Sequence, residues 1–560
     1  RIDGGVMRLA PIPSGQVGVV VGGGSGHYPA FAGLVGRGLA AGAVCGNIFA
    51  SPSAGQVVRV GSAVERGAGL LLTFGNYAGD VLHFTLGAER LRRQGIDVRI
   101  VTVTDDIASA PIDQQELRRG IAGGLAVYKV AGAAAEAGLP LDEVERLARK
   151  ANGRTRSLGV AFSGCTLPGA DQPLFEVPSG RMAIGMGLHG EPGLSEGPLT
   201  EAGPLAALLV ERLLAERPAD VPEDQQRLVV LLNGLGCFKY EELFVLFGAV
   251  NRELQGRGVV MADCECGELV TSLDMAGVSL SFFWLDGELE GFWNAAADSA
   301  AYRRGQLAAE SDGPQPLATQ RPEPELPSGP PTQTAAPLTP VQQALLARFK
   351  AVEEELQERV EELGGLDAVA GDGDHGLGML RGIRGARESA IGACGRGCGP
   401  GEVLMEAGEA WSDHGGGTSG ALWGGALLAA GQSLAQATEI GPNDVAAAFG
   451  AALQAVIDLG QAAPGDKTML DALQPFCLRL RADLDAGLDL AQALQNAANT
   501  SLEAATATAD LLPQRGRARP HGQRSLGHPD PGAMSMAYCL LAASAGYVGL
   551  HGVADPAQAS

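Results

Sequence analysis

The chain has 560 residues, more than one hydrophobic core usually serves, so two to four domains are expected. It carries 41 Lys plus Arg against 64 Asp plus Glu, a net charge of -23, which argues against nucleic acid or an anionic membrane surface as a partner. Nine cysteines form no recognisable disulfide framework, and the first residues, which start at Arg1 without Met and look truncated, show no signal-peptide pattern. We therefore expect a cytoplasmic protein that handles small molecules.

The N-terminal part alternates short apolar runs with Ala-rich helical stretches, which predicts an α/β fold. The pattern changes near residue 155, so we expect two α/β lobes, about 1–155 and 156–310. The predicted strands include residues 17–21, 70–73, 98–103 and 228–232.

Residues 311–340 hold nine of the 32 prolines and almost no aliphatic run, so we expect a linker there. The remaining segment, 341–560, opens with apolar residues at helical spacing from Leu345 to Leu363. Further Ala- and Leu-rich stretches are punctuated by Gly and Pro, which predicts an all-α domain. The uncharged run from Pro531 to Leu550 is too weakly apolar for a membrane span, and we interpret it as a buried helix.

A cluster of acidic residues follows the first of these helices. Asp367, Asp372 and Asp374 are interleaved with glycines in LDAVAGDGDHG. The glycines allow a tight turn, and three nearby carboxylates are the oxygen ligands that Mg²⁺ prefers. The same pattern is also compatible with a solvated acidic turn.

Two of the eight histidines lie in glycine-rich loops of the N-terminal part. His27 ends VGVVVGGGSGH, and His189 lies in GMGLHGEPG. The first loop lacks the spacing and the distant acid of a dinucleotide-binding fingerprint. Loop histidines of this kind are approachable for acid-base or nucleophilic chemistry, although they can also be ordinary surface residues.

Residues 460–468, GQAAPGDKT, nearly match a phosphate-binding P-loop. Asp466 separates the second glycine from Lys467, and no strand precedes the segment, so it is not a Walker A motif.

Seven motifs together resemble those of the ATP-dependent dihydroxyacetone kinase family, and they cover nearly the whole chain: GGGSGH, NYAGD, GLHGEPG, AGDGDHG, GGTSGALWG, APGDKTMLDAL and GHPDPGA. Their order resembles the fused form, with a ketose-binding K half, a Pro-rich linker and a nucleotide-binding L half. The resemblance implies an α/β K domain over 1–310 and an all-α helical barrel that binds ATP over 341–560.

In the K half, the resemblance implies that His189 adds to the substrate carbonyl and holds the ketose as a hemiaminal. The cradle of Gly24, Ser25, Gly26 and His27 would bind the sugar oxygens, and Asp80 would act as base toward the hydroxyl that is phosphorylated. Fixing the substrate covalently would help to position it for phosphoryl transfer.

In the L half, the resemblance assigns Asp367, Asp372 and Asp374 to Mg²⁺ ions that bridge the triphosphate. It further implies that Asp466 caps a helix beside the nucleotide. The implied nucleotide contacts are His375, Gly376, Gly417, Thr418, Ser419, Gly465, Asp466, Arg517, Asp530, Pro531 and Gly532.

Three positions depart from better-known members. Gly75 stands where they carry Lys, which we expect to free volume for a longer ketose such as erythrulose, and Tyr28 replaces the commoner Glu. Residues 516–521 replace the family's usual GRASYL with GRARPH, which would alter a loop over the nucleotide.

The resemblance favours a homodimer in which the L half of one chain serves the K half of another. Two alternatives stay open: a kinase that keeps ADP bound and takes phosphate from a protein donor, and a ketose-sensing regulator without catalysis. The sequence does not decide between dihydroxyacetone and D- or L-erythrulose, and it does not exclude a side activity that cyclises FAD.

Overall fold

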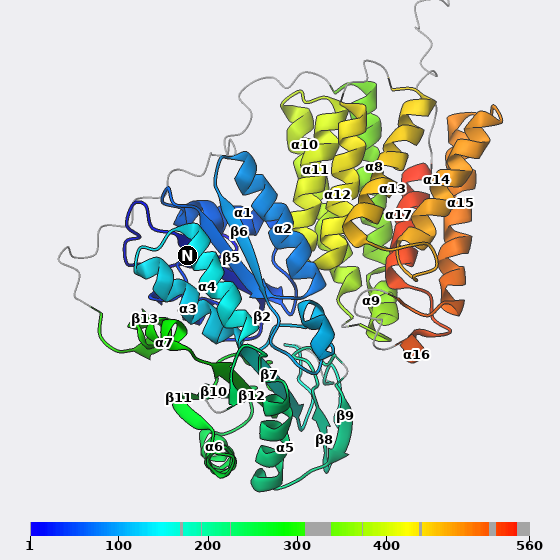
Figure 1. Ribbon diagram of the computed structural model, residues 1–560. Coiled ribbons are helices and arrows are strands. Elements are labelled where there is room, and N and C mark those ends of the chain that lie inside the picture. Colours follow the sequence, from blue (N-terminus) through cyan, green and yellow to red (C-terminus); the bar gives the residue numbers. More distant parts are fainter. Residues whose placement is uncertain are drawn as a thin grey trace, which may run out of the picture. The chain divides into compact units, whose positions relative to one another are not determined.

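The computed structural model describes residues 2–168, 172–191, 193–223, 226–307, 338–371, 373–435, 440–514 and 522–545. The chain divides into two compact units, Arg1–Glu323 and Pro324–Ser560 (Figure 1). The predicted linker lies almost wholly outside the described residues. Within the described parts of the chain, no helix is both long and apolar enough to cross a membrane.

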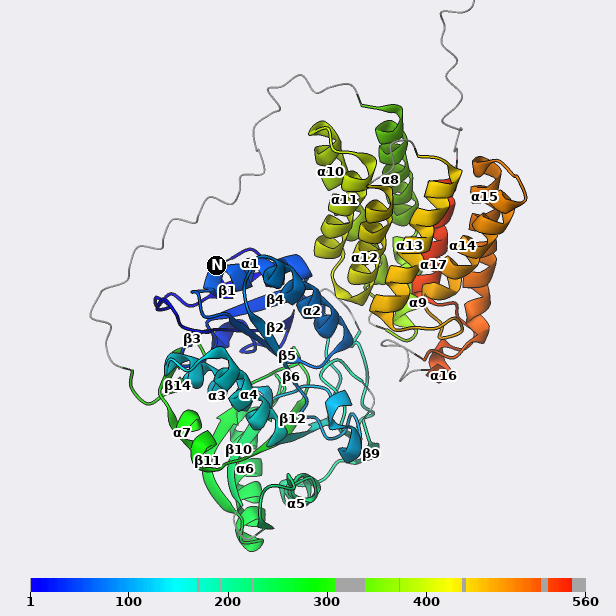
Figure 2. The same ribbon diagram turned by 45° about the horizontal axis from the view of Figure 1, so that its top comes forward.

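The first sheet of unit 1 is mainly parallel, with strand order β1-β4-β2-β5-β6 and only β1 antiparallel to its neighbour. Its strands are β1 (Gly5–Met7), β2 (Gly18–Ser25), β4 (Gly42–Ile48), β5 (Leu70–Gly75) and β6 (Val98–Val103). The helices that cover it are α1 (Ala54–Val64) and α2 (Ala78–Arg93) on one face, and α3 (Gly124–Glu136) and α4 (Leu141–Gly153) on the other (Figures 1 and 2).

Alternating side chains of β2 explain the three layers of this lobe. Val20 packs into the core beneath α1 and α2, whereas Val19 and Val21 pack into the core beneath α3 and α4. A strand buried on both faces in this way is typical of a parallel sheet, and it matches the continuous apolar run of the sequence.

The second sheet of unit 1 is mixed, with strand order β11-β10-β12-β7-β8-β9. Only β10 and β11 are parallel. Helices α5 (Ala202–Ala215) and α6 (Tyr240–Gly256) pack against one face, as both ribbon views show. The strands are β7 (Thr155–Ala161), β8 (Arg181–Ile184), β9 (Ser195–Pro198), β10 (Arg227–Gly234), β11 (Val260–Gly267) and β12 (Gly277–Trp284).

The two lobes of unit 1 share a core. Val229 and Leu231, on the face of β10 away from α5 and α6, belong to the same buried cluster as Val19 and Val21. The last strands also return to the first lobe, because β13 (Ala297–Ser299) pairs with both β14 (Arg303–Arg304) and β3 (Gly36–Arg37). Short elements complete the unit: the 3₁₀ helices η1 (Ala32–Leu34) and η2 (Ile112–Leu117), and α7 (Gly287–Asn294).

Unit 2 is helical throughout its described residues, as the sequence predicts. The order of helix contacts, α8-α10-α11-α12-α13-α14-α15-α17 and back to α8, closes a barrel. Its helices are α8 (Pro340–Glu358), α9 (Val360–Ala368), α10 (His375–Gly395), α11 (Pro400–Gly415), α12 (Gly417–Leu434), α13 (Pro442–Gly460), α14 (Leu470–Asp485), α15 (Leu490–Ala507), η4 (Thr508–Asp510), α16 (Gly522–Ser525) and α17 (Pro531–Ser544).

The structure changes one prediction and bears out another. The helical pattern from Leu345 to Leu363 is split at Arg359, whose φ of -100° and ψ of 4° separate α8 from α9. Arg359 donates hydrogen bonds to Glu355 and Glu362, one on each side of the break. The apolar run that begins at Pro531 is the buried helix α17, as far as the chain is described.

Candidate active site

His27 and His189 come from different lobes of unit 1 and meet at their ring nitrogens. His27 follows β2 of the first sheet, and His189 lies in the loop between β8 and β9 of the second. Their Nε2 atoms are 3.1 Å apart. The glycine loop is fastened to the second lobe, since Leu273 donates its N–H to the Gly26 carbonyl and Thr271 donates to that of His27.

The partners of the two Nδ1 atoms assign the tautomers. His27 Nδ1 lies 2.8 Å from the Thr271 carbonyl oxygen, so it must be a donor. His189 Nδ1 lies 3.0 Å from Glu191 Oε1, whose carboxylate also accepts the His189 backbone N–H. Both Nε2 atoms would then carry lone pairs in the neutral forms. A hydrogen bond between them requires one further proton, which the pair shares.

Burial and charge favour the neutral form of His27. Burial lowers its pKa to about 3, and the charge of His189 acts in the same direction. His27 Nε2 therefore binds a proton much less readily than an ordinary imidazole. Burial opposes ionisation of Glu191, but the charges and hydrogen bonds of His189 and the charge of Arg119 hold the pKa of this carboxyl well below its usual range.

Three rings hold the imidazole of His189 at steep angles. The His27, Phe49 and Tyr77 rings lie 5.0, 4.8 and 5.1 Å from it, with interplanar angles of 78°, 82° and 83°. His27 itself stacks on Phe49 at 5.0 Å and 14°. This packing leaves few orientations open to the ring, so Nε2 is fixed in direction.

The other predicted K-half residues surround this pair in different ways. Asp80 is buried in the first turn of α2, the turn that starts at Tyr77. Gly24 and Gly26 pass close to Phe49, since an added Cβ would lie 3.1 Å from its carbonyl carbon and 2.8 Å from its ring, respectively. Ser25 donates its hydroxyl to the Gly46 carbonyl at 2.6 Å.

The space beside Gly75 is filled by an aromatic ring. A Cβ at Gly75 would lie 3.0 and 3.1 Å from two ring carbons of Tyr77 and 3.3 Å from the Gly120 carbonyl oxygen. This contact concerns only the first carbon of a side chain, so the expectation that the missing Lys leaves room for a longer ketose stays a prediction. Tyr28, the second departure in the K half, is 61% exposed.

In unit 2, the acidic turn joins α9 to α10. Asp367 lies in α9, and Asp374 is the residue before α10. Asp367 accepts the His375 N–H at 3.4 Å, and an added Cβ at Gly371 would lie 2.3 Å from its carboxylate. A Cβ at Gly376 would be 2.2 Å from the Val360 carbonyl oxygen, so the two helices need glycine where they approach.

Charges in this turn suit a divalent cation. Burial and the neighbouring Asp367 raise the pKa of Asp374. Burial also raises the pKa of Asp530 to about 7, and Asp471 and Asp367 add to this effect. Carboxylates that repel one another in this way fit a site that a cation would neutralise. Asp372 lies outside the described residues, and among those described no group of three metal-ligating side chains is assembled.

Other predicted nucleotide contacts lie at helix starts. Gly417, Thr418 and Ser419 form the first turn of α12, which contacts α10. Asp530 caps α17 by accepting the Ala533 N–H at 2.7 Å, with Pro531 and Gly532 in the first turn. His375 Nε2 hydrogen-bonds with the Ser535 hydroxyl of the same helix at 2.9 Å. Exposed N–H groups at helix starts favour phosphate oxygens. Arg517 lies outside the described residues.

The turn of residues 463–471 differs from its expected form. The N-cap of α14 is Met469, and Asp466 accepts the Ala463 N–H within the turn instead of capping the helix. Asp471 accepts the N–H groups of Gly465 and Thr468. The helix begins at Leu470, after a turn in which Gly465 has a φ of +92°.

Lys467 is a structural residue of this turn. Its Nζ donates to the carbonyl oxygens of Leu511, Ser525 and His528 at 3.1, 2.7 and 2.9 Å. All three donors of the ammonium are thus used by the protein. This agrees with the conclusion that the segment is not a Walker A motif.

Comparison with known proteins decides the family. Sequence models of the Dak1 domain and the DAK2 domain match residues 3–301 and 369–545. The chain is 51% identical to L-erythrulose kinase of Pectobacterium atrosepticum, covering 97% of this chain and 92% of the relative. It is 52% identical to D-erythrulose kinase of Mycolicibacterium smegmatis, covering 96% and 92%. The chain belongs to the Dak kinase family.

More distant Dak proteins also match over most of their length. Human triokinase/FMN cyclase is 34% identical, covering 94% of this chain and 91% of the relative. The solved dihydroxyacetone kinase of C. freundii in complex with AMP-PNP and Mg²⁺ is 31% identical, covers 95% of this chain and 91% of that one, and has a TM-score of 0.47. The resemblance predicted from the seven motifs is confirmed, as is its assignment to kinases.

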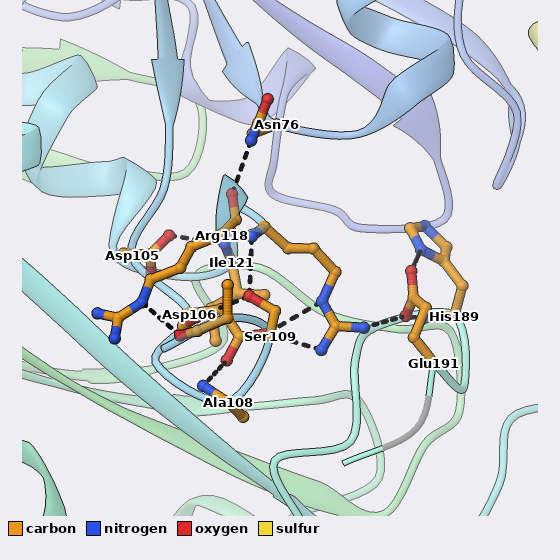
Figure 3. Close-up of polar contacts among 11 residues, drawn as sticks. Asn76, Asp105, Asp106, Ala108, Ser109, Arg118, Ile121, His189 and Glu191 are labelled. Carbon is orange, nitrogen blue, oxygen red and sulfur yellow. Dashed lines mark hydrogen bonds and ion pairs between the residues drawn. The ribbon is translucent and has the colours of Figure 1, made fainter. Parts of the chain in front are cut away.

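Three charged residues near the two histidines were not predicted from the sequence. Glu191 lies inside the GLHGEPG motif, two residues from His189, and this spacing is the one local signal that could have pointed to it. Arg119 and Asp106 belong to other segments, and the fold brings Arg119 into contact with both Asp106 and Glu191. Asp106 and Glu191 are labelled in Figure 3.

Proposed function

We propose that this protein transfers the γ-phosphate of ATP, with Mg²⁺, to a terminal hydroxyl of a short ketose held as a hemiaminal on His189. The observation that carries the proposal is the 3.1 Å approach of the His27 and His189 Nε2 atoms, with both Nδ1 atoms engaged by oxygens. Only an Nε2 atom is then available to attack a carbonyl carbon.

The shared proton balances the addition step. His189 passes the proton to His27 and its Nε2 lone pair forms a bond to the carbonyl carbon. The π electrons of the carbonyl move to its oxygen, which takes the proton from His27. Because His27 is a weak base in its buried position, it returns the proton readily. Asp80 is proposed as the base that accepts the proton of the hydroxyl to be phosphorylated.

We assign the nucleotide to unit 2. Asp367, Asp372 and Asp374 would hold Mg²⁺, which supplies charge neutralisation of the triphosphate. The first turns of α12 and α17 and the turn at Gly465 would bind nucleotide oxygens, with Arg517 as a further contact. The raised pKa values of Asp374 and Asp530 support the fit, because burial and neighbouring carboxylates disfavour their charged forms and a bound cation would offset this.

The substrate is proposed to be erythrulose, with dihydroxyacetone as the smaller alternative. Relatives about half identical over nearly the whole chain are named as L- and D-erythrulose kinases. Values of kcat/KM for dihydroxyacetone, D-erythrulose, L-erythrulose and glyceraldehyde, measured with Mg·ATP alone, test this assignment. Formation of ketose phosphate only after a phosphocarrier protein is added would favour the ADP-retaining alternative, and binding without turnover would favour the regulator.

We propose a cytoplasmic homodimer in which the two units of different chains cooperate. Mixing a His189→Ala variant with an Asp372→Asn variant, after subunit exchange, tests this arrangement. Each variant alone should be inactive, and the mixture should regain a fraction of the wild-type rate. If a mixed dimer, verified by its mass, showed no activity, the K and L halves of the same chain would have to act together.

A further inference from the structure

A line of alternating charges runs from β6 of the first lobe to His189 of the second. Asp106 and Arg119 are ion-paired at 2.9 Å, Arg119 lies 3.7 Å from Glu191, and Glu191 is 3.0 Å from His189 Nδ1. Figure 3 labels Asp106, Glu191 and His189. Asp106 is 2% and Arg119 14% exposed, so water screens these charges little.

Hydrogen bonds hold both members of the first pair. Asp106 accepts the Arg119 Nε–H and Nη2–H, and also the Ala108 backbone N–H. The backbone of Arg119 donates to the Ser109 hydroxyl and accepts the N–H of Asp106. These hydrogen bonds therefore hold the Arg119 guanidinium in a fixed position next to Glu191.

The segment before His189 is shaped around this contact. A Cβ at Gly187 would lie 2.1 Å from Glu191 Oε2 and 2.7 Å from Arg119 Nη1, so both charged groups pass directly over this glycine. The Gly187 N–H donates to the Glu191 carbonyl and closes the turn that carries His189. The backbone therefore places the carboxylate and the imidazole together.

We propose that Asp106 and Arg119 are positioning residues that act through Glu191 on His189. Arg119 keeps the Glu191 carboxylate oriented, and the carboxylate holds His189 in the tautomer with Nδ1 protonated and Nε2 directed at the carbonyl. This is the part that an oriented carboxylate plays beside a catalytic imidazole. The inference rests on the proposed function, in which His189 Nε2 is the nucleophile.

The test combines four variants with two controls. Arg119→Met and Asp106→Asn interrupt the line, Arg119→Lys keeps the charge without the two-point contact, and Glu191→Gln removes the charge nearest His189. Arg181→Met and Glu196→Gln are matched controls, because these residues form an exposed ion pair at 3.3 Å on neighbouring strands of the same lobe. Thermal unfolding of every variant reports whether it is folded.

The first readout is kinetic. Losing a residue that orients a functional group costs about 10- to 100-fold. We expect kcat/KM for the ketose to fall by this factor in Arg119→Met and Glu191→Gln, less in Arg119→Lys and Asp106→Asn, and not in the controls. The KM for ATP should not change. Wild-type rates in Arg119→Met would overturn the proposal.

The second readout does not depend on turnover. NMR of protein with ¹⁵N-labelled imidazoles should show His189 with a protonated, strongly hydrogen-bonded Nδ1 in the wild type and the controls, and tautomer exchange in Arg119→Met and Glu191→Gln. If a variant with reduced kcat/KM had an unchanged His189 spectrum, the substituted residue would have only a structural role, and this would contradict the proposal. A wild-type protein that shows this tautomer but makes no ketose phosphate would refute the proposed function and leave the positioning intact.

Discussion

The Nε2 atom of His27 lies 3.1 Å from that of His189, although the two residues are 162 positions apart and lie in loops of different lobes. The contact is maintained from both sides, by the Thr271 carbonyl on His27 and by the Glu191 carboxylate on His189. A site built across two lobes depends on their shared core, so changes far from the histidines can also affect it.

The buried His27 should make stability fall in acid. Its folded-state pKa is about 3 against the ordinary 6.5, so the unfolded chain binds more protons between these values. The stabilisation is complete above pH 6.5 and is lost as pH falls toward 3. Each pH unit in this window removes at most about 1.4 kcal/mol through this residue.

Chemical unfolding at several pH values checks this expectation. His27→Asn should show a shallower decline of the unfolding free energy from pH 6 to pH 4 than the wild type, because one titrating group is gone. His414→Asn, in unit 2, serves as the control and should decline like the wild type. Equal slopes for His27→Asn and the wild type would argue against a neutral His27 in the folded protein.

A side chain at Gly75 should disturb the ketose site through Tyr77. In Gly75→Ala the new Cβ would meet the Tyr77 ring at about 3.0 Å, and this ring contacts His189. We expect kcat/KM to fall roughly 10-fold for both dihydroxyacetone and erythrulose. Gly203→Ala, in α5 with open space around it, should have no effect. A loss confined to erythrulose would show that the space serves the longer substrate instead.

Lys467 should stabilise unit 2 and support nucleotide binding. Lys467→Met would leave the carbonyls of Leu511, Ser525 and His528 without their charged donor, at a cost of about 3 kcal/mol. The same change would loosen the turn next to Asp530, so the KM for ATP should rise while the KM for the ketose stays constant.

Thermal unfolding and initial rates measure the two effects of Lys467→Met. Lys350→Met removes an exposed ammonium that pairs with Glu354 one turn along α8, and it is expected to be neutral. If Lys467→Met were as stable as this control, the three hydrogen bonds of Lys467 would make no net contribution to the stability of the protein.

Asp374→Asn should have opposite effects with and without ligands. The pKa of Asp374 is raised by burial and by Asp367, so its ionised form costs stability at neutral pH and the cost disappears as pH falls through the folded pKa. The amide should therefore stabilise the ligand-free protein. It should also abolish the rise in melting temperature that Mg²⁺ and a non-hydrolysable ATP analogue give the wild type. A retained rise would remove Asp374 from the metal site.

The sequence predicts the elements of this protein better than their contacts. Apolar runs mark β2, β5 and β10 because strands buried on both faces consist mainly of apolar residues. The break at Arg359 leaves no trace in the pattern, since the apolar spacing continues across it and no Gly or Pro marks the position. The spacing of apolar residues indicates which positions are buried. A break caused by the backbone angles of one residue does not alter that spacing, so it cannot be predicted from it.

The site was predictable only where motifs carry it. His27 and His189 were found from their glycine loops and from the family resemblance. Arg119 and Asp106 were not, because ordinary charged residues in an α/β chain acquire a role only when folding brings them beside Glu191. The approach of the Tyr77 ring to Gly75 was not predicted for a related reason, because the direction of the ring depends on the backbone.

The most direct test of the account is the covalent state of the ketose. With [2-¹³C]dihydroxyacetone, ¹³C NMR of the wild type should show the carbonyl signal replaced by that of a tetrahedral carbon bound to nitrogen. Asp372→Asn should retain this adduct and lose turnover with Mg·ATP, whereas His189→Ala should lose both. Turnover by His189→Ala at the wild-type rate, or a wild-type spectrum with free carbonyl alone at saturating protein, would contradict it.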